Sequence, residues 1–222
     1  MEELISLLKR IREKLEKYGE WLETAGLEMP NSFNMIFNAT TLILEVLHYY
    51  YQIWGIPRTL PSDEIERLKK ENAERVIEIT KWAFVHTLSI IEYSTKEIIK
   101  KMSDEKLSSY PAIRKVKDKL QAGKKVYLST IIKEFKEGQL ISDEEYDVWR
   151  GLIETRNIIV HNNAIAEETK SFKMFNEFRI SFVKGKMLKD KLDFFIKLLD
   201  VAIDQHHQWI RSVINLRFTE KS

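Results

Sequence analysis

The stretch SDEEYDVWRGLIETRNIIVHNN (residues 142–163) decides how this chain folds. It opens with Ser142 and has Glu145 three positions later, which is the pattern of a helix capping box. Apolar side chains then recur at helical spacing, at Tyr146, Trp149, Leu152, Ile153, Ile159 and Val160. The stretch predicts an amphipathic helix that ends near residue 161.

Most of the remaining chain shows the same periodicity, interrupted by Gly and Pro. We expect further helices over residues 3–24, 32–54, 62–102, 111–121, 127–137 and 190–217. Ser62 is the expected cap of the longest one. The segment 55–61 holds Gly55, Pro57 and Pro61, and it is the expected domain boundary.

One segment alternates in the manner of a β-strand pair. FRISFVKGKML (residues 178–188) predicts a small β-hairpin with Lys184-Gly185 as its turn, and residues 164–175 predict a loop. The sequence therefore predicts an all-α protein, an up-and-down helical bundle with a small β-hairpin before the last helix. Residues 1–60 would form a helical N-terminal extension, and residues 62–217 the bundle itself.

Composition excludes several classes of protein. The 222 residues are 44% hydrophobic and 32% charged, with 7 Gly and 4 Pro, which favours a folded helical domain. There are no cysteines, which excludes disulfides and thiolate sites and fits a reducing cytoplasm. The formal net charge is only +2, so affinity for nucleic acid has to come from local patches. The charged N-terminus and the shortness of the most apolar run (37–55) predict no signal peptide and no membrane span.

The end of the 142–163 helix carries polar groups that a purely structural helix does not need: Arg156, Asn157, His161, Asn162 and Asn163. Histidine can take or give a proton near neutral pH. Arginine stays charged and offers forked donors to a phosphate. On an ideal helix Asn157 and His161 share a face, whereas Arg156 lies about 140° from His161. A single copy of the motif therefore does not obviously bring Arg156 and His161 to one phosphate, unless the Arg156 stem reaches round or the helix end distorts. A dimer would supply the partner's residues instead.

The run Arg156-Asn157-Ile-Ile-Val-His161 resembles the R-x4–6-H signature of HEPN domains, which often carry a polar residue directly after the Arg. The trailing Asn162-Asn163, the helix over residues 84–99 and the long final helix are also similar to that family. The resemblance covers residues 62–217 and not the first 60. In the toxins paired with minimal nucleotidyltransferases a Tyr often stands two positions after the His, and this chain has Asn163 there.

The resemblance implies a HEPN-type bundle that forms a homodimer, in which two motifs build one composite site. It implies a metal-independent endoribonuclease without a cofactor, in which the RNA 2′-OH attacks the neighbouring phosphate and leaves a 2′,3′-cyclic phosphate. Arg156 would bind the phosphate, His161 would be the acid or base, and Asn157 would orient the His or the phosphate. Defence or a toxin–antitoxin pair would be the setting, with an antitoxin or another protein as partner.

Two further residues are candidate supports of this site. Glu92 lies inside an apolar run, where a carboxylate has to be paired. It could orient Arg156 or His161, or it could form a salt bridge with a Lys. Asn162 could support the site, whereas Asn162 or Asn163 could instead be the left-handed cap of the helix.

A basic stretch offers a candidate RNA-binding surface. Residues 96–125 hold ten Lys or Arg and four acids. Such a strip could follow an RNA backbone, or it could be only a solvated helix face. The candidate RNA-binding residues are Lys115, Lys117, Lys119, Lys124 and Lys125.

Two functions and a purely structural role as a helical subunit stay open at this point, and with them the question of whether the chain is an enzyme. One is the ribonuclease, and the other is a non-catalytic HEPN-like module that binds RNA, a nucleotide or a protein partner. The sequence offers no convincing set of metal ligands. Glu45 and His48 form a single E-x-x-H pair without the second copy that a di-iron site needs, and the rings of His206 and His207 diverge on a helix.

Overall fold

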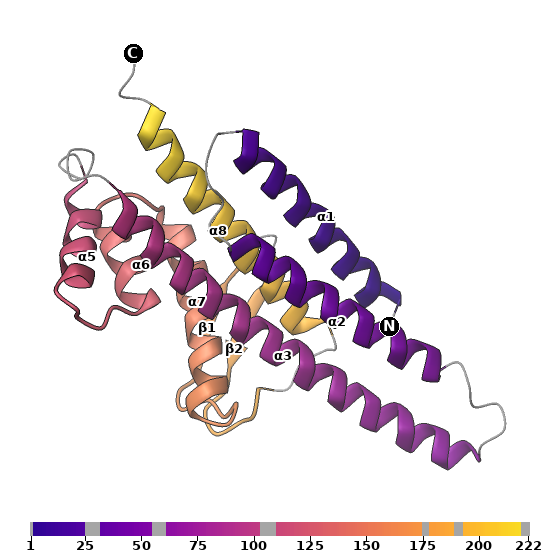
Figure 1. The fold of residues 1–222 in the computed structure, drawn as a ribbon. Helices are drawn as coiled ribbons and strands as arrows, with labels where there is room; N and C mark the ends of the chain where they lie inside the picture. The colour runs from indigo at the N-terminus through magenta and orange to yellow at the C-terminus, as the bar shows by residue number, and fades with distance from the viewer. Residues whose placement is uncertain are drawn as a thin grey trace. The chain divides into compact units, whose positions relative to one another are not determined.

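The computed structural model describes residues 2–24, 32–54, 61–102, 110–174, 178–188 and 193–218. These residues form α1 (Glu2–Thr24), α2 (Ser32–Trp54), α3 (Ser62–Lys101), α5 (Pro111–Gln121), α6 (Leu128–Glu137), α7 (Asp143–His161), β1 (Lys170–Lys173), β2 (Arg179–Phe182) and α8 (Phe194–Phe218) (Figure 1). The prediction of a mainly helical chain with a small sheet before the last helix is confirmed. The predicted start of the last helix at residue 190 lies outside the described residues.

The chain forms two compact units, and the helices α3 and α8 contribute to both. Unit 1 contains Met1–Thr87 and Asp190–Asp200, and unit 2 contains Leu88–Lys189 and Val201–Ser222. The domain boundary expected near residue 61 stays a prediction. Helix α3 is continuous over 40 residues. Its first part belongs to unit 1 and its last part to unit 2.

In unit 1, α1 and α2 pack against each other and run in opposite directions (Figure 1). The apolar stripe expected on α1 is buried, at Leu4, Leu8, Ile11 and Leu15. Polar contacts tie the same helix to its neighbours. The Arg12 guanidinium lies 4.9 Å from the centre of the Phe37 ring, and Lys14 Nζ lies 2.5 Å from Asp200 Oδ1. Apolar burial and a half-buried ion pair thus hold α1 in unit 1.

The core of unit 2 contains a row of stacked rings. Phe135 of α6 stacks on Trp209 of α8 with 5.5 Å between ring centres, and Trp209 is 6.3 Å from the His206 ring. His206 is buried, and this burial together with the neighbouring His207 lowers the pKa of His206 from 6.5 to about 3. A neutral imidazole therefore takes the place of an aromatic core residue.

The small sheet differs from the predicted hairpin. Strand β2 lies where expected, but it pairs antiparallel with β1, with Phe172 opposite Ile180, in the segment predicted as loop. The Lys184-Gly185 turn is present, with Gly185 at φ 73°, and the chain after it makes an isolated bridge from Met187 to Ile165. The small sheet before the last helix was therefore predicted correctly, but its bounds at residues 178–188 were wrong, because β1 is only four residues long and shows a single alternation.

Gly151 determines how closely β1 approaches α7. A Cβ at this position would lie 2.9 Å from the Phe172 Cβ and 3.2 Å from the Met174 Sδ. Real side chains do not approach so closely, so only glycine allows this contact. Phe172 and Met174 are in turn buried by it.

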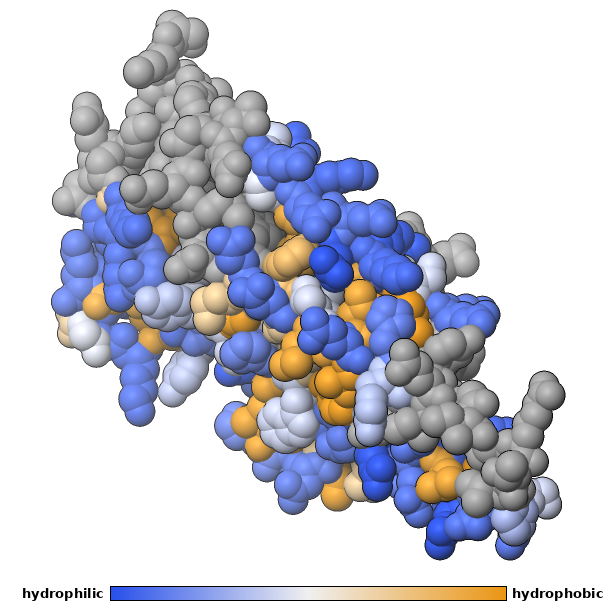
Figure 2. Space-filling view, turned by 45° about the vertical axis from the view of Figure 1, so that its right-hand side comes forward, coloured by the Kyte–Doolittle hydropathy of each residue, from blue (hydrophilic) through white to orange (hydrophobic). Residues whose placement is uncertain are grey.

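Hydrophilic side chains cover most of the face seen in Figure 2, and apolar side chains reach the surface in several places on it. The exposed large apolar residues include Leu42, Tyr49, Trp82 and Tyr93. Within the described part of the chain, no helix combines the length and the apolar character that crossing a membrane requires.

Burial of His206 predicts a pH-dependent stability. Its folded pKa of about 3 lies below its ordinary value of 6.5, so between these values the unfolded chain binds the extra proton and stability is lost as pH falls. Between about pH 7.5 and pH 5.5 this group alone should lower the free energy of unfolding by roughly 1.4 kcal/mol. We expect the free energy of unfolding, measured in urea at several pH values, to fall more steeply with falling pH for wild type than for His206→Leu. Parallel pH curves for the two proteins would contradict it.

Substitution of Gly151 should be destabilising although the residue lies inside a helix. Gly→Ala at an exposed helical site gains about 1 kcal/mol. Here the added methyl group meets Phe172, so we expect Gly151→Ala to lower the free energy of unfolding by about 1–3 kcal/mol. Urea unfolding measures this change in the free energy of unfolding. A Gly151→Ala protein more stable than wild type would show that β1 does not lie against α7.

Candidate functional site

Helix α7 carries the Arg–His motif, and its start is fixed by the expected capping box. The Glu145 backbone N–H donates to Ser142 Oγ at 3.1 Å, and the Ser142 N–H donates to Glu145 Oε2 at 2.7 Å. The buried face of the helix includes Leu152, Thr155 and Ile159. These contacts fix the rotation of α7 and so decide where Arg156, Asn157 and His161 point.

Arg156 lies against α3 in unit 2. Its Nη1 is 3.7 Å from Glu92 Oε2, and its Nη2 donates a long hydrogen bond of 3.5 Å to Ser89 Oγ. The side chain is 27% exposed, and its Nε is buried without a hydrogen-bond partner among the described residues. The guanidinium is therefore held in place, although not all of its N–H donors have a hydrogen-bond partner among the described residues.

Glu92 joins two cations. Its side chain is 14% exposed, and Oε1 accepts a 2.5 Å hydrogen bond from Lys96 Nζ while Oε2 faces Arg156. The prediction that this carboxylate has to be paired is confirmed. Both open alternatives for Glu92, a contact with Arg156 and a salt bridge with a Lys, are present together.

His161 and Asn157 make no contact with Glu92 or Ser89 among the described residues. His161 is the last residue of α7 and is exposed, and within the described ranges no hydrogen bond, ion pair or ring contact involves its imidazole. Asn157 is half-buried and lines a groove, and no described residue bonds its amide. Of the three motif residues, Arg156 is thus the one with side-chain contacts to α3 in the described part of the chain.

The two asparagines after His161 end the helix. The Asn162 backbone N–H donates to Ile158 O at 3.2 Å, and the Ala164 N–H donates to the same oxygen at 3.0 Å. Asn163 takes a left-handed conformation, with φ 49°, and Asn162 does not, with φ −119°. The alternative of a left-handed cap is therefore confirmed for Asn163 and wrong for Asn162.

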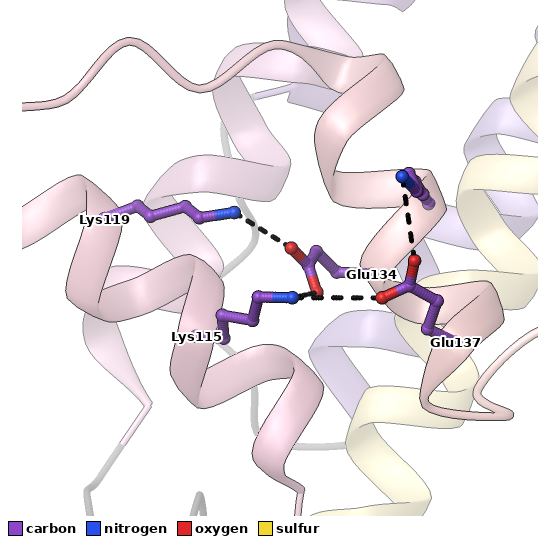
Figure 3. A network of polar contacts seen from close by, with 5 residues as sticks. Lys115, Lys119, Glu134 and Glu137 are labelled. Carbon is purple, nitrogen blue, oxygen red and sulfur yellow. Dashed lines mark hydrogen bonds and ion pairs between the residues drawn. The ribbon is translucent and has the colours of Figure 1, made fainter.

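The predicted basic strip is only partly exposed. Lys117 is buried and its Nζ donates to the Met102 carbonyl at 2.6 Å, so it cannot lie on an RNA backbone. Lys115 and Lys119 bind the buried Glu134 at 2.7 and 2.9 Å (Figure 3). Lys124 and Lys125 are exposed.

The Glu134 cluster joins α5 to α6. Burial alone raises the pKa of the Glu134 carboxyl, but the hydrogen bonds and charges of Lys115 and Lys119 outweigh it and lower that pKa. The same hydrogen bond raises the pKa of Lys115. Two of the predicted RNA-binding lysines are therefore engaged in holding two helices together.

Sequence analysis missed a groove of about 540 Å³ in unit 2, lined by α5, α6, α7 and β1. Four cations reach it: Lys119, Lys133, Arg150 and Lys170. Of these only Lys119 was a candidate from the sequence, because the others come from segments without a basic run. Asn157 lies in the same groove, which connects it to the motif.

Comparison with known proteins adds no relative. No protein-family model matches this chain, and no curated protein or solved structure matches it. The relation to HEPN domains remains a prediction based on residues 156–161 and their surroundings.

The contact between Glu92 and Arg156 should be measurable as a coupling energy. We expect Glu92→Gln and Arg156→Gln to be non-additive in urea unfolding, with a coupling of about 1 kcal/mol, because the two charges meet away from bulk water. The matched control is Lys100→Gln with Arg156→Gln, because Lys100 pairs with Glu97 and shares no partner with Arg156. Additivity of the Glu92 pair within about 0.3 kcal/mol would show that the contact does not hold Arg156.

Proposed function

We propose that this protein is a metal-independent endoribonuclease of HEPN type, which acts as a homodimer in defence or in a toxin–antitoxin pair. The observation that carries the proposal is the arrangement at the end of α7. A half-buried guanidinium is held by Glu92, and an exposed imidazole without a partner in the described part of the chain follows five residues later.

The contacts of Arg156 suit a group that binds a phosphate. Charge-assisted hydrogen bonds in well-formed pairs are about 2.7–2.9 Å long. Arg156 is 3.7 Å from Glu92 and 3.5 Å from Ser89, so its contacts are loose and its donors are not used up. Glu92 would then be a positioning residue, which aligns the guanidinium without neutralising it completely.

His161 supplies the proton transfer in this proposal. It would take the proton of the RNA 2′-OH as this oxygen attacks phosphorus, or give one to the departing 5′-oxygen. The bond to the 5′-oxygen breaks and a 2′,3′-cyclic phosphate remains. Arg156 would bind the extra negative charge of the pentavalent phosphorane. Asn157 would orient the phosphate from the groove beside it.

Geometry favours a site composed of two chains. Arg156 contacts α3, and on an ideal helix His161 lies about 140° from it, so a single helix does not readily bring both groups to one phosphate. A second copy related by a two-fold axis brings a second Arg156 and a second His161 to the same place. Such a dimer is part of the proposal.

The other candidate function is a non-catalytic module that binds RNA, a nucleotide or a protein. Its support is that Glu92 already places a negative charge beside Arg156, as in a structural ion pair. Cleavage separates the two functions, because a module with a structural pair binds RNA and does not cut it.

Removal of either group of the motif should abolish cleavage. We expect wild type to cut single-stranded RNA in EDTA and to leave 2′,3′-cyclic ends. His161→Ala and Arg156→Ala should each lower the rate by at least about 100-fold, since a proton-transfer group or a charge-stabilising donor contributes this much. Denaturing gels and mass spectrometry of the products measure both.

His86→Ala and Arg67→Ala are matched controls, because both residues are exposed on α3 and no contact among the described residues joins either of them to Arg156 or His161. They should cut at the wild-type rate. Cleavage that survives in His161→Ala, or no cleavage by wild type on RNAs of varied sequence, would exclude the nuclease. A monomeric molar mass by light scattering would exclude the composite site.

A further inference from the structure

The groove found in unit 2 is lined by residues from three helices and one strand. Lys119 comes from α5, Lys133 from α6, Arg150 from α7 and Lys170 from β1. Hydroxyl groups of Ser129 and Thr130 also line it. Four elements therefore bring cations and hydrogen-bond donors to one hollow of about 540 Å³.

The positive charges in the lining of the groove are not all neutralised by acids of the same lining. The two acids in the lining are Glu134, bound by Lys115 and Lys119, and Glu154, bound by Lys170 at 3.0 Å. The remaining two cations have only long contacts with acids outside the lining. Lys133 is 68% exposed and 3.8 Å from Glu137, and Arg150 is 52% exposed and 3.4 Å from Asp147.

Arg150 is placed beside two rings. Its Cζ lies 5.8 Å from the centre of the Tyr146 ring and 5.5 Å from that of Phe172, and both rings line the groove. Contact with aromatic faces orients a guanidinium and leaves its edge free for an anion. Cations combined with aromatic rings are the usual means of holding a single nucleic acid strand.

The groove also points toward the motif. Arg150, Ile153 and Asn157 all line it, and positions three and four apart share one helix face. The next position on that face, four residues after Asn157, is His161. A strand that follows the groove along α7 therefore reaches the proposed acid or base.

The groove has a volume of about 540 Å³, and its four cations and two aromatic rings suit a single strand, whose phosphates and bases are both accessible. Resting on the proposed function, we infer that this groove holds the sugar–phosphate backbone of single-stranded RNA and leads it to His161. Lys133 and Arg150 are the main phosphate contacts, and Lys170 would be a third once it leaves Glu154 and Glu168, which it binds at 3.0 Å.

The test measures binding without cleavage. The probe is a fluorescent 2′-O-methyl RNA of about 12 nucleotides, which lacks the attacking hydroxyl and fits the site sizes of single-strand binders. Wild type and the triple variant Lys133→Gln, Arg150→Gln, Lys170→Gln are titrated by fluorescence anisotropy between about 50 and 200 mM salt. We expect the triple variant to bind at least tenfold more weakly at the lowest salt. Its slope of log affinity against log salt should be smaller by about 2, because each phosphate contact on a single strand contributes about 0.7.

Two controls make the result specific. Arg67→Gln, Lys69→Gln, Lys70→Gln removes the same charges from the exposed start of α3 and should keep the wild-type slope. The charge-preserving variant Lys133→Arg, Arg150→Lys, Lys170→Arg should retain binding, and equal urea midpoints show that the variants fold.

An unchanged slope in the groove variant, an equal loss in the α3 control, or no binding of the probe by wild type overturns the inference. None of these outcomes depends on cleavage, so they are distinguishable from a failure of the proposed nuclease. Conversely, loss of binding in the groove variant supports the RNA path even if wild type cuts no RNA.

Discussion

The close approach of β1 to α7 at Gly151 is the constraint on which the candidate site depends. Because no side chain stands at this position, the Phe172 Cβ and the Met174 Sδ lie only 2.9 and 3.2 Å from the place where a Cβ would be. The strand then places Lys170 and Phe172 beside Arg150 and Asn157, and this forms one wall of the groove. A larger residue would move the strand outward and separate these groups, so a packing contact without any chemistry of its own sets the shape of the proposed binding surface.

Helix α7 distributes its polar residues in different directions because successive side chains lie about 100° apart. Once Leu152 and Ile159 are buried, Arg156 has to face α3 and Asn157 has to face the groove. Arg156 and His161 lie about 140° apart on such a helix. The proposed ribonuclease therefore includes a second chain, and its activity would depend on assembly.

Buried carboxylates decide which cations are left for a ligand. Glu134 engages Lys115 and Lys119, and Glu92 engages Lys96 at 2.5 Å but Arg156 only at 3.7 Å. A count of lysines along the chain does not reveal this, because the ten cations of residues 96–125 include one that is buried on a carbonyl oxygen and two that hold helices together. Exposed cations that lack a short ion pair, such as Lys133, are the better candidates for RNA.

The sequence by itself determined the helices, including the capping box at Ser142, because helical hydrogen bonds and periodicity are local. It also located the motif and indicated that Glu92 needs a partner, since a carboxylate in an apolar run cannot stay unpaired. Only the tertiary structure decided that β1 is a strand, that Lys117 is buried and that Lys133, Arg150 and Lys170 meet at one groove. These features depend on contacts between segments far apart in the chain, and no local pattern of residues encodes which surfaces will pack together.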